Sequence, residues 1–378
     1  MTEDENQMRV MLREFAIPGH FVSAEPYGSG HINQTFRSTF SQAGTRVRYI
    51  HQKINDQVFR RPDLLMENIE RVLAHQESKI LAAGRSDPDR RAMKLIPGVD
   101  GKPYVRDASG GWWRTYLFVE RTRSCDVLET DGQATEIARA IGRFQLDLAD
   151  LKGPRLHETI PKFHDARFRY SAFREAVAGD VKGRAAEVRA DIDWFLAQEE
   201  RTQSIVRAMD EGTVPERITH NDTKANNILL DDATGEGICV IDLDTVMPGS
   251  LLYDLGDMVR TATATAAEDE PDAGKMTVNL SRFGALIRGF VGQTASLLTP
   301  GERALLPGAG RVITTIIGLR FLTDYLAGDR YFRVHRPNHN RDRARTQIAL
   351  VDSMDAHHQT LAALCEEAWS QFVPGGPS

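Results

Sequence analysis

Cysteine is scarce in this sequence of 378 residues, which contains only Cys125, Cys239 and Cys365. The three are far apart and none forms a Cys-x-x-Cys pair, so neither a disulfide framework nor a zinc ribbon is expected. Low cysteine use is typical of proteins in a reducing compartment. We therefore expect a cytoplasmic location.

The sequence also lacks long apolar runs and an excess of basic residues. Its most nearly apolar stretch, 312–319, is far too short to cross a bilayer, and the acidic first residues are unlike a signal peptide. The 53 acidic residues outnumber 47 Lys and Arg, which argues against non-specific nucleic-acid binding because that needs a dense basic face. We expect no nucleic acid, membrane or obligate protein partner, and a small molecule as the binding partner.

The hydrophobic periodicity divides the chain into a strand-rich first part and a helical second part. Strands are expected at 45–54, 112–120, 228–230 and 239–241. Helices are expected at 3–15, 63–83, 133–150, 168–177, 187–209 and over most of 277–369. This grouping predicts an α+β fold of two lobes, 1–120 and 121–378, with a hinge near residue 120 and the functional site between them. The segment 261–275 is predicted to be an exposed loop.

The most informative stretch runs from His220 to Asp244. Asp222 and, five residues later, Asn227 precede a short apolar strand, and a second such strand ends at Asp242. A hairpin would bring Asn227 and Asp242 side by side, and their oxygens suit a Mg²⁺ ion that carries nucleotide phosphates. Asp222 could accept the proton of an attacking hydroxyl. This is the layout of phosphoryl transfer in the protein-kinase group.

The motif His220-x-Asp222-x4-Asn227, followed by Ile241-Asp242, resembles the signature of the aminoglycoside phosphotransferase and choline kinase superfamily. The resemblance implies a bilobal protein-kinase-like fold with a small β-rich N-lobe and a larger, mainly helical C-lobe. Within the superfamily, further stretches are similar to N-acetylhexosamine kinases, which phosphorylate the anomeric (C1) hydroxyl. These stretches are 28–33, 52–55, 65–69, 245–249, 252–257, 320–322 and 328–332.

The resemblance implies roles for the acidic residues. Asp222 is the expected catalytic base and also positions the acceptor hydroxyl, whereas His220 is expected to have a structural role. Asn227 and Asp242 are the expected Mg²⁺ ligands. Asp244 stands where kinases have glycine, and we expect either a second Mg²⁺ ligand or a group that supports the first. Separately, Asp254 and Asp257 would either orient the catalytic loop or cap a helix.

The resemblance also implies where ATP binds. The turn at 28–30 would cover the phosphates with backbone amides, although it is not a Walker A loop. Lys53 would contact the phosphates and pair with Glu67 or, slightly less favoured, Glu70. Backbone groups of the hinge around Glu120 would contact adenine. The implied nucleotide-binding residues are Gly28, Ser29, Gly30, Lys53, Glu67 and Glu120.

The sugar site implied by the resemblance consists of His31, Arg320 and Tyr331, with 163–165 as a further candidate. From the residues alone, Arg320 lies on an apolar helix face and needs a partner. That partner is either Asp324, one turn later, or a bound sugar.

Together these features predict an ATP- and Mg²⁺-dependent kinase that phosphorylates the C1 hydroxyl of a free N-acetylhexosamine. Four alternatives are open: the same chemistry on an aminoglycoside, choline, homoserine or another sugar; protein phosphorylation, disfavoured because no Ala-Pro-Glu segment follows Asp242; a nucleotide-binding pseudokinase; and a metal-dependent phosphohydrolase, disfavoured by the lack of a histidine-rich ligand set.

Overall fold

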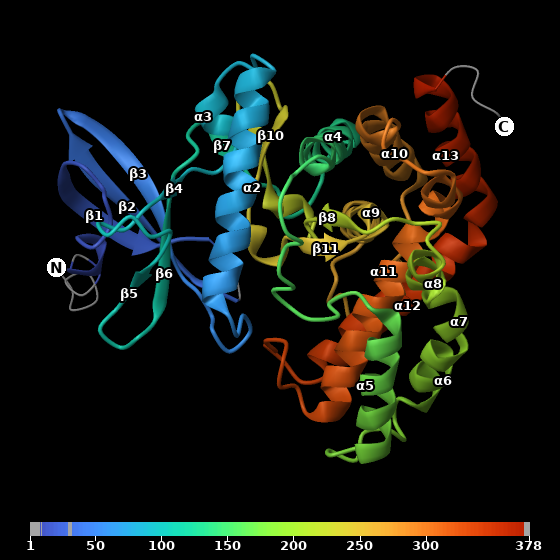
Figure 1. Cartoon of the computed structure of the whole chain (residues 1–378). Helices are drawn as coiled ribbons and strands as arrows, with labels where there is room; N and C mark the ends of the chain where they lie inside the picture. The colour runs from blue at the N-terminus through green and yellow to red at the C-terminus, as the bar shows by residue number, and fades with distance from the viewer. Residues whose placement is uncertain (1–7, 9, 29–31, 374–378) are drawn as a thin grey trace.

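The computed structural model of the chain describes residues 8, 10–28 and 32–373. It has a β-rich N-lobe and a larger helical C-lobe, with helix α2 (Pro62–Ala82) between the N-lobe sheet and the C-lobe helices (Figure 1). The predicted α+β bilobal architecture is therefore confirmed. Of the expected helix at 3–15, most lies outside the described residues.

The N-lobe is built on one antiparallel sheet in the order β1-β2-β3-β6-β4, with β5 paired to β6. Its elements are β1 (His20–Pro26), β2 (Gln34–Gln42), β3 (Thr45–Lys53), α2, α3 (Pro88–Arg91), β4 (Leu95–Ile96), β5 (Val105–Arg106) and β6 (Trp112–Leu117). Both strands that the alternating pattern predicted, at 45–54 and 112–120, are present as β3 and β6.

The two faces of this sheet have different surroundings. Residues opposite each other in paired strands share a face. One face therefore carries Phe36, Tyr49 and Trp113, which form a small core with Met11 and Leu12. The other face carries residues such as Tyr116, which belongs to the large core shared with the C-lobe. The second face is thus the one that lines the cleft between the lobes.

Helix α2 joins the lobes because its apolar positions recur with helical spacing and are buried on both sides. The amide of Asn68 donates to the carbonyl oxygens of His157 at 2.8 Å and Val246 at 3.1 Å. Just beyond the helix, Arg85 forms a bidentate ion pair with Asp147. These contacts fasten α2 to the C-lobe.

The C-lobe combines helices with two small antiparallel sheets, β10-β9-β7 and β11-β8. Its strands are β7 (Thr122–Arg123), β8 (Arg217–Thr219), β9 (Ile228–Asp231), β10 (Gly237–Val240) and β11 (Met247–Gly249). Its helices are α4 (Asp131–Leu148), α5 (Ala166–Gly179), α6 (Arg189–Ala197), α7 (Glu199–Thr202), α8 (Ser204–Asp210), α9 (Leu251–Ala262), α10 (Leu280–Thr294), α11 (Pro300–Ala327), α12 (His339–Ala356) and α13 (His358–Phe372). The 3-10 turns are η1 (Ala225–Asn227), η2 (Leu243–Thr245) and η3 (Ala273–Lys275).

Two sequence expectations need correction. The single helix predicted at 187–209 is three short helices, α6 to α8, because the chain turns at Gln198 and Gln203 while Phe195 and Ile205 stay in the core. The segment 261–275 is not a free loop throughout. The backbone pairing of Ala264 with Val278 and the carbonyl of Glu268, which accepts from Thr346 Oγ1 at 2.5 Å, tie it to the lobe.

Helix α11 is long and apolar enough to cross a membrane by length and composition alone, more so than the short stretch at 312–319 suggested. Most of its most apolar segment is buried inside the C-lobe, and a helix in a protein core can be equally long and apolar. It begins with a capping box between Thr299 and Glu302. Near its other end it carries Arg320.

Candidate active site

The catalytic loop lies between β8 and η1, and the strands that follow form the predicted hairpin. Ile228 of β9 pairs with Val240 of β10, and the amide of Ile241 donates to the carbonyl of Asn227 at 2.9 Å. This register places Asn227 next to the residue that follows Ile241, which is Asp242. The hairpin expected from the spacing is therefore present, and the joint role of Asn227 and Asp242 as metal ligands stays a prediction.

The buried carboxylate of Asp254, on α9, holds the catalytic loop in place. One of its oxygens accepts from the backbone amide of His220 at 2.9 Å and the other from that of Asn221 at 2.6 Å. Ser250 supplies the N-cap of α9. Asp254 therefore orients the loop, which was one of the two expectations for it, and does not cap the helix.

His220 has the structural position expected of it. Its Nε2 lies 2.9 Å from the carbonyl oxygen of Ile241, and its own carbonyl accepts from Thr245 Oγ1 at 2.7 Å. The ring thus joins the catalytic loop to the segment that carries Asp242.

Asp222 sits at the centre of a charged and hydrogen-bonded group. Its carboxylate lies 3.1 Å from the ammonium of Lys224 and 3.2 Å from the amide nitrogen of Asn227. Burial alone would raise the pKa of Asp222, but Lys224 and His220 outweigh it and hold that pKa below its ordinary value. The carboxylate is therefore ionised at neutral pH and able to accept a hydrogen bond from a hydroxyl.

The residues at the end of the hairpin fit a Mg²⁺ ion that arrives with a nucleotide. The amide nitrogen of Asn227 donates to Asp222, at 2.8 Å to its carbonyl, which leaves the amide oxygen for a metal. Burial and the neighbouring Asp244 raise the pKa of Asp242 to about 6, a cost that a divalent cation would remove. Within the described residues, no cluster of three or more His, Cys, Asp or Glu side chains could by itself hold a metal ion. A site of few protein ligands completed by phosphates and water is the usual Mg²⁺ arrangement.

Asp244 is occupied by groups of the N-lobe. One carboxylate oxygen pairs with the guanidinium of Arg114 on β6, and the other accepts from the amide of Asn33 at 2.6 Å. Both side chains of the ion pair are almost fully buried. These contacts agree with the supporting role expected for Asp244, and its role as a metal ligand stays a prediction.

Lys53 differs from the expectation. It lies opposite Trp113, on the sheet face that points away from the cleft, and its ammonium is 3.1 Å from the carboxylate of Asp107. Glu67 instead meets His157, with its carboxylate 3.1 Å from Nε2. The expected pair between Lys53 and Glu67 is therefore wrong, because Lys53 meets Asp107 and Glu67 meets His157. The sequence predicted the strand correctly, but side chains alternate along it and the cleft face was not known.

The remaining nucleotide-site expectations have mixed outcomes. Gly28 lies in the turn after β1 with a φ of 79°, a left-handed conformation that glycine adopts readily. Ser29, Gly30 and His31 lie outside the described residues. The carboxylate of Glu120 pairs with Arg48, and its carbonyl accepts from Arg90 at 3.0 Å. A role of Glu120 toward adenine stays a prediction.

On the other side of the catalytic loop, Arg320 rests on aromatic rings. Its guanidinium carbon lies 5.0 Å from the ring centre of Phe163, 5.5 Å from Tyr331 and 5.4 Å from Phe332. Arg320 Nη2 lies 3.4 Å from the hydroxyl oxygen of Tyr331. The guanidinium forms no ion pair with any described carboxylate. Burial lowers the pKa of Arg320, and Tyr331 and Asp222 offset this in part.

Asp324 is not the partner of Arg320. Its carboxylate accepts from the backbone amides of Arg330 and Tyr331, both at 2.8 Å, and of Phe332 at 3.0 Å. It thereby shapes the loop that brings Tyr331 and Phe332 to the guanidinium.

Arg169 and His164 add to this second region. Arg169 donates to the carbonyl of Phe163, and burial and the neighbouring Arg320 lower its pKa to about 9. His164 Nε2 lies 2.9 Å from the carbonyl of Asn221, whereas its buried Nδ1 has no hydrogen-bond partner. The candidate segment 163–165 therefore touches both Arg320 and the catalytic loop.

Sequence reasoning missed Arg114, Lys224 and Arg169. Lys224 could have been found, because it follows Asp222 by two residues inside the motif. Arg114 and Arg169 gave no local signal, since their partners are remote in sequence.

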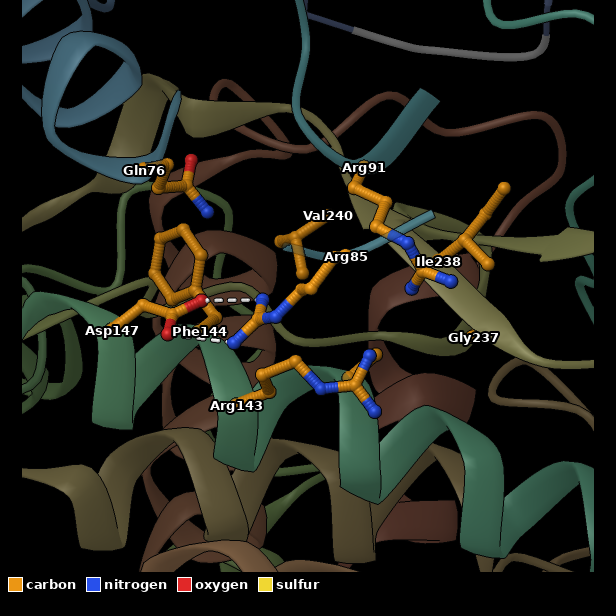
Figure 2. A pocket seen from close by; sticks show the side chains of 10 residues that line it. Gln76, Arg85, Arg91, Arg143, Phe144, Asp147, Gly237, Ile238 and Val240 are labelled. Atoms are coloured by element: carbon orange, nitrogen blue, oxygen red, sulfur yellow. Dashed lines mark hydrogen bonds and ion pairs between the residues drawn. The ribbon is translucent and has the colours of Figure 1, made fainter. Parts of the chain in front are cut away.

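The pocket in Figure 2 is separate from these residues and lies between α3, α4 and β10. Its arginines are paired: Arg85 with Asp147, and Arg91 and Arg143 with Glu236. Its volume of about 20 Å³ has room for roughly a single water molecule. The ion pairs around this pocket connect the lobes. The pocket itself is too small for a ligand of substrate size.

The fold is shared with solved structures of small-molecule kinases. An aminoglycoside phosphotransferase from Alicyclobacillus acidocaldarius is 12% identical with a TM-score of 0.56, covering 95% of this chain and 96% of that one. A spectinomycin phosphotransferase in complex with ADP and its antibiotic is 12% identical with a TM-score of 0.54, covering 94% and 98%. A choline kinase from Cryptosporidium parvum is 14% identical with a TM-score of 0.53, covering 98% of each chain.

The model of the phosphotransferase enzyme family matches residues 23–285 of this chain, a span that begins within β1 and includes β2 to β6, the catalytic loop and the Asp242 segment. The site described above contains an acid, an amide and a downstream acid in the order expected for phosphoryl transfer to a hydroxyl. The chain therefore belongs to the phosphotransferase enzyme family and is a small-molecule kinase of the aminoglycoside phosphotransferase and choline kinase type.

Proposed function

We propose that this enzyme transfers the γ-phosphoryl group of ATP to the anomeric C1 hydroxyl of a free N-acetylhexosamine, giving the sugar 1-phosphate and ADP. The observation that carries the proposal is the acceptor side of the catalytic loop. There, the cation of Arg320 lies on three aromatic rings, has no carboxylate partner among the described residues, and is close enough to Asp222 for the two charges to interact.

The nucleotide side supports the transfer step. Asp222 is ionised and fixed by Asn227, so it can align the acceptor hydroxyl and take its proton as the phosphoryl group moves. The ammonium of Lys224 lies beside that carboxylate and supplies positive charge near the group in transit. Asn227 and Asp242 would hold Mg²⁺, which neutralises charge on the phosphates.

The acceptor side favours a neutral substrate over a cationic one. Arg320 and Arg169 lie close together, and neither pairs with a described carboxylate. A choline, an aminoglycoside or another amine would meet like charge there, which is costly in a partly desolvated site. A neutral sugar offers hydroxyl and acetamido oxygens that accept hydrogen bonds from a guanidinium.

A regulatory pseudokinase and a metal-dependent phosphohydrolase have less support. A pseudokinase does not need a catalytic acid or metal ligands. This chain has Asp222 as the candidate acid, and Asn227 and Asp242 as candidate metal ligands on one hairpin. A two-metal phosphohydrolase needs a cluster of ligands, and the described part of the chain has none.

The test is release of ADP from Mg²⁺-ATP in the presence of N-acetylglucosamine, N-acetylgalactosamine, glucose, galactose, choline, homoserine or kanamycin. The methyl glycosides of both N-acetyl sugars serve as matched controls because only the anomeric hydroxyl is blocked. We expect turnover with a free N-acetylhexosamine and none with its methyl glycoside.

Three different results would contradict the proposal in different ways. Turnover with an amine and not with the sugars would keep the catalytic residues and reject the acceptor. Equal turnover with the methyl glycoside would place the phosphate on another hydroxyl. Nucleotide binding without turnover on any acceptor would favour the pseudokinase.

A further inference from the structure

We propose that Arg114, and not Lys53, is the N-lobe cation that contacts the nucleotide phosphates, and that Asp244 is its fixed carboxylate partner. This inference rests on the proposed function only in requiring a nucleotide in the cleft. It does not depend on the acceptor.

The first support is the face of the sheet. Arg114 lies opposite Gln52 in the register of β6 with β3, whereas Lys53 lies opposite Trp113. Neighbouring positions on a strand point to opposite faces, and Trp113 belongs to the core on the side away from the cleft. Arg114 is therefore on the cleft face, and Lys53 is not.

The second support is where each cation ends. The guanidinium of Arg114 crosses from the N-lobe to Asp244, two residues after Asp242. The ammonium of Lys53 ends at Asp107, which also accepts from Trp113 Nε1 at 2.8 Å and from the amide of Gly111 at 2.8 Å. Only Arg114 reaches the segment that carries the metal-binding carboxylate.

The third support is the set of hydrogen-bond donors that stay available. Arg114 Nε donates to Gln52 at 2.9 Å and Nη1 pairs with Asp244, whereas Nη2 has no partner in the described part of the chain. Tyr116, two residues further on the same face, has a buried hydroxyl without a hydrogen-bond partner. A buried hydroxyl without a partner is costly unless a ligand accepts from it or donates to it. A phosphate oxygen is such an acceptor, and guanidinium groups bind phosphate well.

The fourth support is that Glu67, the favoured acidic partner on helix α2, is engaged elsewhere. Glu67 is turned to His157, and Asn68 binds the helix to the C-lobe. In kinases of the protein-kinase group, a lysine on the third strand pairs with a glutamate on this helix. Here the pair is rebuilt from β6 and the segment after Asp242, so a cation and a carboxylate still meet at the phosphates.

The test compares nucleotide affinity in Arg114→Lys, Arg114→Met and Lys53→Met, each in the full chain. The readouts are calorimetric Kd values for Mg²⁺-ATP without acceptor and the unliganded melting temperature. We expect Arg114→Met to weaken binding roughly tenfold or more, the scale of a lost charge-assisted hydrogen bond. Arg114→Lys should lie between that variant and the wild type, and Lys53→Met should bind within about twofold of the wild type.

A purely structural ion pair predicts a different result. Since removing one partner of a buried pair can unfold a protein, the double variant Arg114→Met with Asp244→Asn removes both charges together. Weak nucleotide binding by this folded double variant supports the proposal. Wild-type affinity in it, or a tenfold loss in Lys53→Met, would overturn the proposal even if the sugar assignment held.

Discussion

An arginine lies on each side of the catalytic loop, and the two differ in whether a carboxylate pairs with them. Arg114, on the nucleotide side, is fully buried, and although burial disfavours its charge, Asp244 raises its pKa. Arg320, on the proposed acceptor side, contacts aromatic rings and a tyrosine hydroxyl, forms no ion pair with a described carboxylate, and has a pKa that burial lowers. Arg114 therefore keeps only its Nη2 donor for a ligand, whereas the whole guanidinium of Arg320 is without a carboxylate partner among the described residues.

The proposed division into a nucleotide side and an acceptor side would let one family fold serve different acceptors. On the proposed nucleotide side, Arg114 and Asp244 form a fixed ion pair between the lobes. We therefore expect that side to bind the same cosubstrate whatever the acceptor. On the acceptor side, Arg320 is held by the rings of Tyr331 and Phe332, which lie on a loop shaped by Asp324. Changes in that loop would alter the acceptor without disturbing the phosphates.

The strongest disruption should come from Asp222, which lies between the two sides. Asp222→Asn removes the proton acceptor, and we expect kcat to fall by about 10²–10⁴-fold with Mg²⁺-ATP affinity nearly unchanged. Steady-state kinetics and calorimetry measure the two effects. Asp210→Asn, at a surface pair with Arg167, is the matched control. Near-normal kcat in Asp222→Asn would reject the base assignment.

Removal of Arg320 should affect the acceptor side alone. In Arg320→Met we expect KM for the sugar to rise about tenfold or more, because a charged donor to the substrate is lost, while KM for ATP stays constant. Arg189→Met changes an exposed arginine in the same lobe and should alter neither value. A rise in KM for ATP equal to that for the sugar would contradict the separation of the two sides.

The charge of Lys224 should set the acid limit of activity. Activity is lost as the pH falls through the folded-state pKa of Asp222, because the protonated acid no longer accepts a proton. Lys224 holds that pKa below its ordinary value. In Lys224→Met, burial is less opposed and the acid limb of the kcat profile should move to higher pH. An unchanged limb would show that another group titrates.

The smallest effect is expected for Lys53, on the far face of the N-lobe sheet. Its pair with Asp107 is partly exposed, so Lys53→Met should change the free energy of unfolding by less than about 1 kcal/mol. Urea unfolding measures this value. A much larger loss would mean that Lys53 supports the sheet in a way that its contacts do not show.

The parts of the site that depend on local sequence were predictable, and those that depend on register were not. The spacing of Asp222, Asn227 and Asp242 predicted the hairpin because all three lie in one contiguous segment. Whether Lys53 points to the cleft or away from it depends on which face of β3 packs against the C-lobe, and the sequence of the strand alone does not determine that face. The partners Arg114 and Asp244 lie 130 residues apart, and no local pattern joins them.

The fold shows the same division. The helices at 63–83 and 133–150 have strong periodicity and appear as α2 and α4 with ends shifted by one or two residues. The region 187–209 has the same kind of pattern but turns twice, because packing of Phe195 and Ile205 into one core outweighs the continuity of a helix.

The most direct test of the account is the structure of the product formed from Mg²⁺-ATP and free N-acetylglucosamine or N-acetylgalactosamine. Phosphorus–proton coupling in NMR spectra identifies the carbon that carries the phosphate. The account predicts phosphate on C1 together with an equal amount of ADP. Phosphate on any other carbon, or no sugar phosphate from an enzyme that phosphorylates an amine, would contradict it.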